Sequence, residues 1–129
     1  MAQLLRRHGV TPTAQRTRIA AAMFARGMHV SAEDVYAAVN QETTSVSRAT
    51  VYNTLRLLVE KGLINQVIVD PSKVFYDPNV SPHYHLYDIE TGELTDVAAD
   101  QLEIRGLPDL PPGKELDGVD VVVRLRRRV

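Results

Sequence analysis

The spacing of apolar residues changes at Gly62, and this change constrains the fold of the chain more than any other feature. Before Gly62, apolar residues recur three or four positions apart, which is typical of amphipathic helices. After it, "LINQVIV" and "KVFYD" alternate as strands do, and "DPSK" between them predicts a turn that suits the fixed φ of Pro71. Helices followed by a two-stranded hairpin predict a winged helix-turn-helix.

Three helices are expected near the start of the chain, over residues 2–9, 13–27 and 31–41. Thr13 provides the cap of the second helix, and glycines end the first and the second. Ser31, followed three positions later by an acidic residue, forms a relaxed capping box that marks the start of the third. The buried face expected for the third helix consists of Val35, Tyr36 and Val39.

A fourth helix is expected from Ser47 to Gly62, and it carries two different stripes of side chains. The apolar stripe should face the core and consists of Val51, Leu55 and Leu58. The other stripe is polar and consists of Arg48, Tyr52 and Arg56, with Asn53 beside it. Because a recognition helix reads base edges with side chains of its first turns, the polar stripe predicts a DNA-reading face.

Each side chain of the polar stripe suits a contact with duplex DNA. Arg48 can bind a guanine edge or a phosphate, Tyr52 offers a ring for thymine methyl groups, and Asn53 can pair with adenine or bind a phosphate. Arg56 would lie along the backbone, while two arginines of the second helix would hold phosphates. The predicted DNA contacts are Arg16, Arg18, Ser47, Arg48, Thr50, Tyr52, Asn53 and Arg56. A solvated helix face and a protein-interaction module are the competing interpretations.

The distribution of charge supports a polyanionic partner for the first half of the chain. Residues 1–62 carry eight Lys or Arg and four Asp or Glu, a net charge of +4. Residues 63–129 carry seven and twelve, a net charge of −5, which suits cation binding or pairing. Chance clustering of solvated charges would give the same numbers. The charge distribution therefore supports DNA binding only in combination with the predicted winged helix.

Length and composition exclude several classes of protein. The 129 residues suffice for one ordinary domain or two very small ones, and 44% hydrophobic with 24% charged residues is typical of soluble globular proteins. No apolar run reaches membrane-spanning length and the first residues lack a signal-peptide stretch, so a cytoplasmic protein without a membrane partner is expected. The absence of cysteine excludes disulfides, thiolate zinc sites and thiol catalysis.

The segment "PNVSP", residues 78–82, predicts a boundary between two domains, 1–77 and 78–129. Beyond it, "HYHLYDI", "LTDV" and "VDVVVRLRRR" predict the strands of a small α/β domain, so the fold class of the whole chain should be α+β. A domain of this size has a small core, and we therefore expect a homodimer. The dimer would pair strands or bury the face of Val119, Val121 and Val123.

Two histidines, His83 and His85, lie one residue apart on the first of these strands. Side chains two apart on a strand share a face, so the pair can start a metal site. Asp96 on the next strand can reach back, while Asp77 and His29 supply further candidates from the first domain. Taken singly, the histidine pair is more often on the surface or bonded to a carbonyl, His29 is more often a helix-entry residue, and the two aspartates are acids beside turns. Together, histidines and carboxylates without thiolates favour a borderline-to-hard divalent ion.

A metal site of this kind also raises the question of catalysis. An ion with an open coordination position can activate water for hydrolysis. However, no glutamate or serine is placed as an evident base or nucleophile. A metal-dependent hydrolase is therefore a distant alternative, and no enzyme activity is expected.

Three segments, "HVSAEDVYAAV", "SRATVYNTLRLLVEKGLI" and "VFYDPNVSPHYH", resemble the ferric uptake regulator family. The resemblance covers residues 3 to 128 and keeps the motifs in order. It implies a metal-responsive, dimeric repressor with an N-terminal winged-helix domain and a C-terminal dimerisation domain. By this resemblance, the protein would bind palindromic operator DNA and control genes of iron or haem homeostasis or of the oxidative-stress response.

The resemblance also implies roles for individual residues. The family's DNA-reading tyrosine maps onto Tyr52. Its regulatory metal site maps onto three histidines and two aspartates, a set that is similar to the peroxide-sensing branch of the family. These residues are His29, Asp77, His83, His85 and Asp96. The implied ion is Fe²⁺ or Mn²⁺, with Zn²⁺ as a substitute in crystals.

Two departures from the family pattern change the expected cofactors. The Cys-x-x-Cys pairs of the family's structural zinc site are missing, with Asp88 and Thr91 at the first pair, so no structural zinc held by four cysteines is expected. The tail "LPDLPPGKELDGVDVVVRLRRR" is similar to the iron response regulator subgroup, whose members report haem or iron status. Tyr84 replaces the middle one of three consecutive histidines there, and since tyrosine and histidine both ligate haem iron, haem stays an alternative. Iron, peroxide and haem are thus three competing signals.

Overall fold

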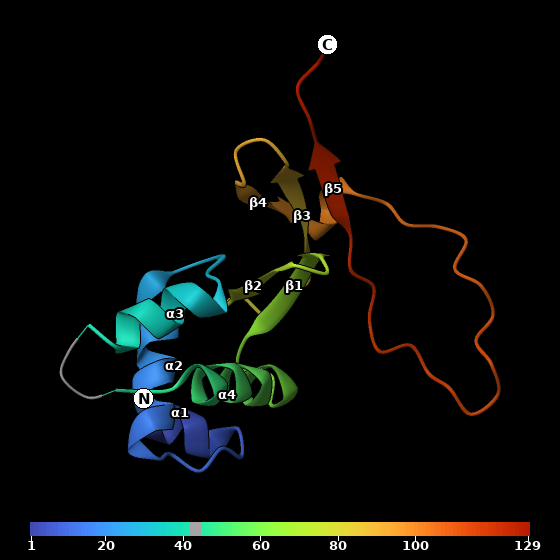
Figure 1. The fold of residues 1–129 in the computed structure, drawn as a ribbon. Coiled ribbons are helices and arrows are strands. Elements are labelled where there is room, and N and C mark those ends of the chain that lie inside the picture. The colour runs from blue at the N-terminus through green and yellow to red at the C-terminus, as the bar shows by residue number, and fades with distance from the viewer. Residues whose placement is uncertain (42–44) are drawn as a thin grey trace. The chain divides into compact units, whose positions relative to one another are not determined.

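The computed structural model describes residues 1–41 and 45–129, which form two compact units, Met1–Val80 and Ser81–Val129. The first unit holds the four α-helices and a two-stranded sheet, and the second holds a three-stranded sheet (Figure 1). Helices and sheets therefore follow one another along the chain instead of alternating. This arrangement confirms the predicted α+β class.

The helices of the first unit begin where the capping residues predicted. Thr13, Ser31 and Ser47 each accept a hydrogen bond from a backbone N–H of the first turn. At Ser31, the carboxylate of Asp34 completes the capping box by accepting from the backbone N–H of Ser31 at 3.1 Å. The helices are α1 (Ala2–Arg7), α2 (Ala14–Arg26), α3 (Ala32–Val39) and α4 (Arg48–Glu60). Within the described ranges, no helix combines the length and the apolar character that crossing a membrane requires.

A single hydrophobic core joins the four helices of the first unit. The predicted apolar stripe of α4 is confirmed, since Val51, Leu55 and Leu58 are fully buried. Tyr36 of α3 was expected in the core and is only partly buried. Its ring packs against the core and also receives the guanidinium of Arg48, which lies 4.3 Å from the ring centroid.

The wing is an antiparallel hairpin of β1 (Asn65–Asp70) and β2 (Lys73–Asp77). At its turn, Oδ1 of Asp70 accepts hydrogen bonds from the backbone N–H and the hydroxyl of Ser72, at 2.8 and 2.7 Å. These bonds hold the pKa of the Asp70 carboxyl below its usual value. Asp77 is the last residue of β2, so it marks the end of the wing.

The second unit is built on a three-stranded sheet in the order β4-β3-β5. The central strand β3 pairs with β4 in antiparallel fashion across a short hairpin, and with β5 in parallel fashion. The elements are β3 (His83–Asp88), β4 (Leu94–Ala98), the 3-10 turn η1 (Ala99–Gln101) and β5 (Val122–Leu125).

Strand β5 is shorter than the predicted strand over residues 119–128. A parallel pair needs a crossover connection. Between β3 and β5 the chain passes through β4 and η1 and then through residues 102–121, which form no helix or strand of their own (Figure 1). The N–H of His85 donates to the carbonyl of Val121 at 3.2 Å, where the ladder with β3 begins. Strand structure is confined to the residues that face β3, so the prediction was too long at both ends.

Candidate functional site

His29 and Asp77 lie together in the first unit. Their shortest approach is 3.3 Å, between Nε2 of His29 and Oδ2 of Asp77. The pairing follows from the residues beside them, because Val30 and Tyr76 form an antiparallel bridge with backbone hydrogen bonds of 3.0 and 2.7 Å. This bridge fastens the segment before α3 to β2, and the neighbours of its two residues are thereby brought side by side.

Burial, a hydrogen bond and an unusual backbone conformation fix the positions of these two residues. Asp77 is fully buried, and its Oδ1 accepts a hydrogen bond from the N–H of Asn79 at 2.8 Å. The other carboxylate oxygen is thus directed at the imidazole of His29. His29 itself has a φ of 59°, in the left-handed region that residues other than glycine rarely adopt. Backbone conformations of this kind are commoner at functional sites than elsewhere.

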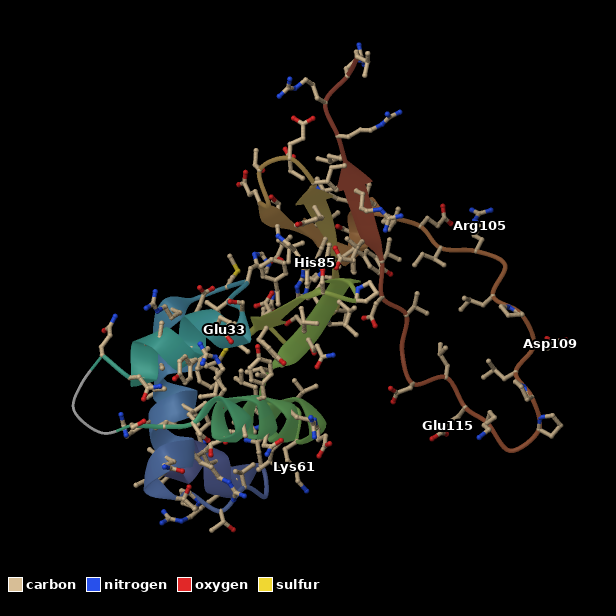
Figure 2. All side chains as sticks on the ribbon, viewed as in Figure 1. Glu33, Lys61, His85, Arg105, Asp109 and Glu115 are labelled. Atoms are coloured by element: carbon tan, nitrogen blue, oxygen red, sulfur yellow. The ribbon has the colours of Figure 1, made fainter. Side chains whose placement is uncertain are left out.

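His83, His85 and Asp96 lie together in the second unit. His85 faces Asp96 in the β3–β4 ladder, and its Nε2 lies 3.3 Å from Oδ1 of Asp96. The Nε2 atom of His83 lies 3.4 Å from the same oxygen. The two imidazole rings are 4.5 Å apart between centroids, so both histidines point from one face of β3, where Figure 2 labels His85. Strand periodicity and the hairpin predicted this grouping.

The chemistry of both groups fits a metal ion. His29, Asp77, His85 and Asp96 each offer one nitrogen or oxygen ligand atom. Imidazole and carboxylate together suit Fe²⁺, Mn²⁺ or Zn²⁺. The ring of His83 is also oriented, because its Nδ1 is hydrogen-bonded to the carbonyl of Ser81 at 2.6 Å, which leaves Nε2 directed at Asp96. A second hydrogen bond of this kind is typical of metal-binding histidines.

The predicted DNA-reading stripe lies on the exposed side of α4. Tyr52, Asn53 and Arg56 are all exposed, with Tyr52 at 41%. Arg48 lies at the start of the helix, and its side chain is 62% exposed. Partial burial, followed by the nearby carboxylate of Glu33, raises the pKa of Tyr52.

Glu33, the second residue of α3, was not predicted from the sequence, and Figure 2 labels it. Its Oε1 atom lies 3.1 Å from Nε of Arg48 and accepts a hydrogen bond from the Tyr52 hydroxyl at 3.3 Å. The capping pattern of α3 drew attention to Asp34 instead. No spacing within one segment links α3 to α4, so this contact becomes visible only in the fold.

Ser47 caps α4, and its hydroxyl is also hydrogen-bonded to that of Thr50. The N–H of Thr50 donates to Oγ of Ser47 at 3.1 Å, and the Ser47 hydroxyl donates to Oγ1 of Thr50 at 2.9 Å. Thr50 also lines a hollow of about 300 Å³ between the first turn of α2 and α4, together with Arg16 and Asn53. Three predicted DNA contacts therefore meet at one concave surface of the first unit.

The two arginines of α2 differ in their surroundings. Nη1 of Arg16 donates to the carbonyl of Thr11 at 3.1 Å, at the exposed start of the helix. Nη2 of Arg18 donates to the carbonyl of Val39, at the end of α3, at 2.6 Å. This bond satisfies a carbonyl that the helix end leaves without an intrahelical partner. The phosphate contact of Arg18 stays a prediction, and the structure adds this bond to the end of α3.

The sequence matches the ferric uptake regulator family over residues 7–107, which is most of the chain. The chain belongs to this family. The peroxide-responsive repressor PerR of Staphylococcus aureus is 31% identical over 98 residues, which cover 76% of this chain and 66% of the repressor. The ferric uptake regulator of Pseudomonas aeruginosa, solved with manganese, has a TM-score of 0.75 and 27% identity, covering 98% of this chain and 97% of that one.

More distant members of the ferric uptake regulator family share the fold. The peroxide stress regulator of Campylobacter jejuni has a TM-score of 0.63 over 100% of this chain and 97% of that one, and at 21% identity it shows the fold alone. The family match confirms the resemblance found in the sequence. Its members are metal-responsive transcription regulators, not enzymes, so the hydrolase alternative loses its support. The match spans about two thirds of the curated repressors, 66% of their length.

Proposed function

We propose that this member of the ferric uptake regulator family is a metal-responsive transcription regulator that binds palindromic operator DNA as a homodimer. The observation that carries the proposal is the pair of ligand groups, His29 with Asp77 in the first unit and Asp96 with His83 and His85 in the second. In this proposal, residues 1–77 form the DNA-binding domain and residues 78–129 the dimerisation and metal-sensing domain. Operator DNA is a cytoplasmic partner in a bacterium, so the protein would act there.

The proposed cofactor is one divalent ion, Fe²⁺ or Mn²⁺, that takes ligands from His29, Asp77, His83, His85 and Asp96. When bound, the ion supplies positive charge that offsets the two carboxylates and joins ligands of both units. The nitrogen and oxygen donors support this choice, and so does the manganese in the structure of the similar Pseudomonas aeruginosa regulator. Metal can control DNA binding only through a higher affinity for the DNA-competent form.

Dimerisation is proposed through the sheet of the second unit. β5 is an edge strand, with Val123 and Leu125 39% and 43% exposed. An edge strand presents unpaired backbone groups that a second chain can pair with. A two-fold dimer presents two copies of α4, which explains why a palindromic site is expected.

Metal analysis combined with DNA binding tests the proposal. The protein is purified without chelators and its metal content measured, and a duplex is then selected from a random library in the presence of Mn²⁺. We expect Mn²⁺ to tighten binding to the selected duplex about fivefold or more, the lower end of typical coupling between sites, and His83→Ala to abolish that effect. The matched control is His8→Ala, since the imidazole of His8 is exposed and is bonded to the carbonyl of Leu4 in the same helix turn. Selection of no duplex, or a metal effect that persists in His83→Ala, would refute the proposal.

Peroxide sensing is a second candidate, supported by the 31% identity to the peroxide-responsive repressor. With iron bound, one oxygen atom of hydrogen peroxide would be added to the imidazole of His29 or His83, and the other would leave as water. Peptide mass spectrometry of the iron-loaded protein after peroxide treatment would then find one added oxygen on one of these histidines. Unmodified histidines after treatment would leave iron availability or haem as the signal.

Haem is the third candidate signal, and Tyr84, between the two histidines of β3, keeps it open. Titration of the metal-free protein with haem would give a strong absorption band if haem is the ligand. Changing both His83 and His85 to alanine should abolish this band. A band of equal strength in the double variant would identify adventitious haem.

A further inference from the structure

Glu33 of α3 holds one edge of the guanidinium of Arg48, the first residue of α4. The Nε atom of Arg48 donates to Oε1 at 3.1 Å and to Oε2 at 3.4 Å. The face of the same guanidinium lies 4.3 Å from the ring centroid of Tyr36, which is within range of cation–π attraction. Arg48 is therefore held by two side chains of α3, one on its edge and one on its face.

These contacts leave the outer edge of the guanidinium available. Within the described residues, the hydrogen bonds of the Arg48 side chain leave through Nε, and its two Nη groups form none. An arginine that is fixed at Nε presents both Nη groups as an oriented pair of donors. Guanine offers O6 and N7 as a matching pair of acceptors in the major groove, and arginine binds them bidentately.

We propose that Glu33 is a positioning residue that fixes Arg48 for bidentate recognition of one guanine in each half of the operator. The inference rests on the proposed function, because it requires α4 to lie in the major groove. As the first residue of α4, Arg48 belongs to the turn from which recognition helices reach base edges. Of the two roles that the sequence allowed for Arg48, guanine edge or phosphate, the proposal selects the first.

The charge of Glu33 explains why a guanine edge fits Arg48 better than a phosphate does. A carboxylate at 3.1 Å offsets the charge of the guanidinium and would repel phosphate oxygens, whereas a guanine edge carries no net charge. The Tyr52 hydroxyl is bound to the same carboxylate, so Glu33 also orients a second side chain of the DNA-reading face. The Arg48 and Glu33 side chains are 62% and 53% exposed, and exposed pairs stabilise a fold little. Their pairing therefore serves orientation more than folding.

The test measures which base positions of the selected duplex each variant reads. Each guanine of one half-site is replaced in turn, and the loss of affinity is measured for the wild type, Glu33→Ala, Arg48→Ala and the double variant, all loaded with Mn²⁺. We expect one guanine whose replacement costs the wild type about fivefold or more. This penalty should vanish in Arg48→Ala, fall to less than half in Glu33→Ala, and be absent in the double variant as it is in Arg48→Ala, because Glu33 acts on this guanine only through Arg48.

Two further variants test whether Glu33 acts by positioning Arg48 or only through its negative charge. Glu33→Gln keeps an oxygen acceptor for Nε, so it should retain more of the guanine penalty than Glu33→Ala. Glu60→Ala removes a carboxylate of equal charge at the exposed end of α4, and it should leave the penalty unchanged. A guanine penalty that survives in Arg48→Ala or remains whole in Glu33→Ala would overturn the inference. Failure of the wild type to select any duplex would instead refute the proposed function, and this inference with it.

Discussion

Asp96 lies directly opposite His85 in the ladder between β3 and β4, and one of its carboxylate oxygens approaches Nε2 of His85 at 3.3 Å. The same oxygen lies 3.4 Å from Nε2 of His83. Because the three residues belong to a hydrogen-bonded hairpin, their spacing is set by the backbone ladder and not by flexible loops. The sheet therefore holds these three side chains together.

Replacing Asp96 by asparagine should weaken Mn²⁺ binding by about 10-fold to 100-fold. The substitution keeps the shape of the side chain but removes its negative charge and one oxygen donor from the histidine pair. Competition between the protein and a fluorescent chelator measures the change in affinity. The fold should persist, since Asp96 is partly exposed and its backbone stays in the ladder.

Asp100 supplies the matched control for this variant. It lies on η1, four residues further along the chain, and is exposed. Asp100→Asn removes the same charge without touching the histidines and should leave Mn²⁺ affinity unchanged. Equal losses in both variants would show that only the overall charge of the second unit matters.

The left-handed backbone of His29 predicts an unusual order of stability for two variants of the metal-free protein. Both His29→Gly and His29→Ala lose the imidazole. Glycine adopts a φ of 59° without strain, whereas alanine there costs about 1 kcal/mol or more. His29→Gly should therefore be the more stable of the two, by about 0.5–1 kcal/mol after the greater backbone entropy of unfolded glycine is counted. Urea unfolding with a chelator present measures this difference.

Met28, the preceding residue, gives the comparison that isolates the backbone effect. It is exposed and does not have a positive φ, so Met28→Ala should be more stable than Met28→Gly. The order of the two variants is thus reversed between neighbouring positions. The same order at both positions would mean that the conformation of His29 is not strained.

The grouping of His83, His85 and Asp96 was predictable because it depends on a local pattern. A period of two places His83 and His85 on one face, and a short hairpin returns Asp96 to them. The buried stripe of α4 was predictable for the same reason, since a period of 3.6 needs only one segment. Features that depend on one element, or on two elements adjacent in the sequence, can therefore be predicted from the sequence.

Contacts between distant elements were not predictable. Glu33 and Arg48 are 15 positions apart, and Arg18 and Val39 are 21 apart, and each pair joins two different helices. Such pairs depend on how the helices pack, and packing depends on side-chain shapes that periodicity does not describe. The position of strand β5 was predicted, but its predicted length was too great. The number of residues that pair with β3 depends on the geometry of the sheet, which the sequence pattern does not describe.

The turn of the wing gives a prediction for the titration of Asp70. Its carboxylate accepts two hydrogen bonds from Ser72, which lower its pKa, so the folded state favours the ionised form. The stabilisation from these bonds is present above the unfolded pKa of about 3.9 and is lost as the pH falls through the lower folded value. Ser72→Ala removes the hydroxyl bond, and the pKa of Asp70 should rise toward its usual value in carboxyl NMR titrations.

Ser72→Thr keeps the hydroxyl and serves as the control for the titration of Asp70. In this variant the pKa of Asp70 should stay below its usual value. Backbone amide spectra of both variants should show an intact hairpin, because the N–H bond to Asp70 remains. An unchanged pKa in Ser72→Ala would mean that the hydroxyl bond is not formed in solution.

Arg18 and Arg56 should separate stability from DNA binding. Arg18 donates to the carbonyl of Val39 at 2.6 Å in a partly buried setting, so Arg18→Ala should lower the free energy of unfolding by about 1–2 kcal/mol. Arg56 is exposed on α4, and Arg56→Ala should change stability by less than about 0.5 kcal/mol. If Arg56 binds a phosphate, its loss should flatten the slope of log affinity against log salt by about 0.9, while Arg18→Ala leaves the slope unchanged.

Thermal unfolding and DNA titrations at several salt concentrations measure both effects. A flatter slope with unchanged stability in Arg18→Ala would instead support the predicted phosphate contact of Arg18, because the bond to Val39 would then be dispensable for folding.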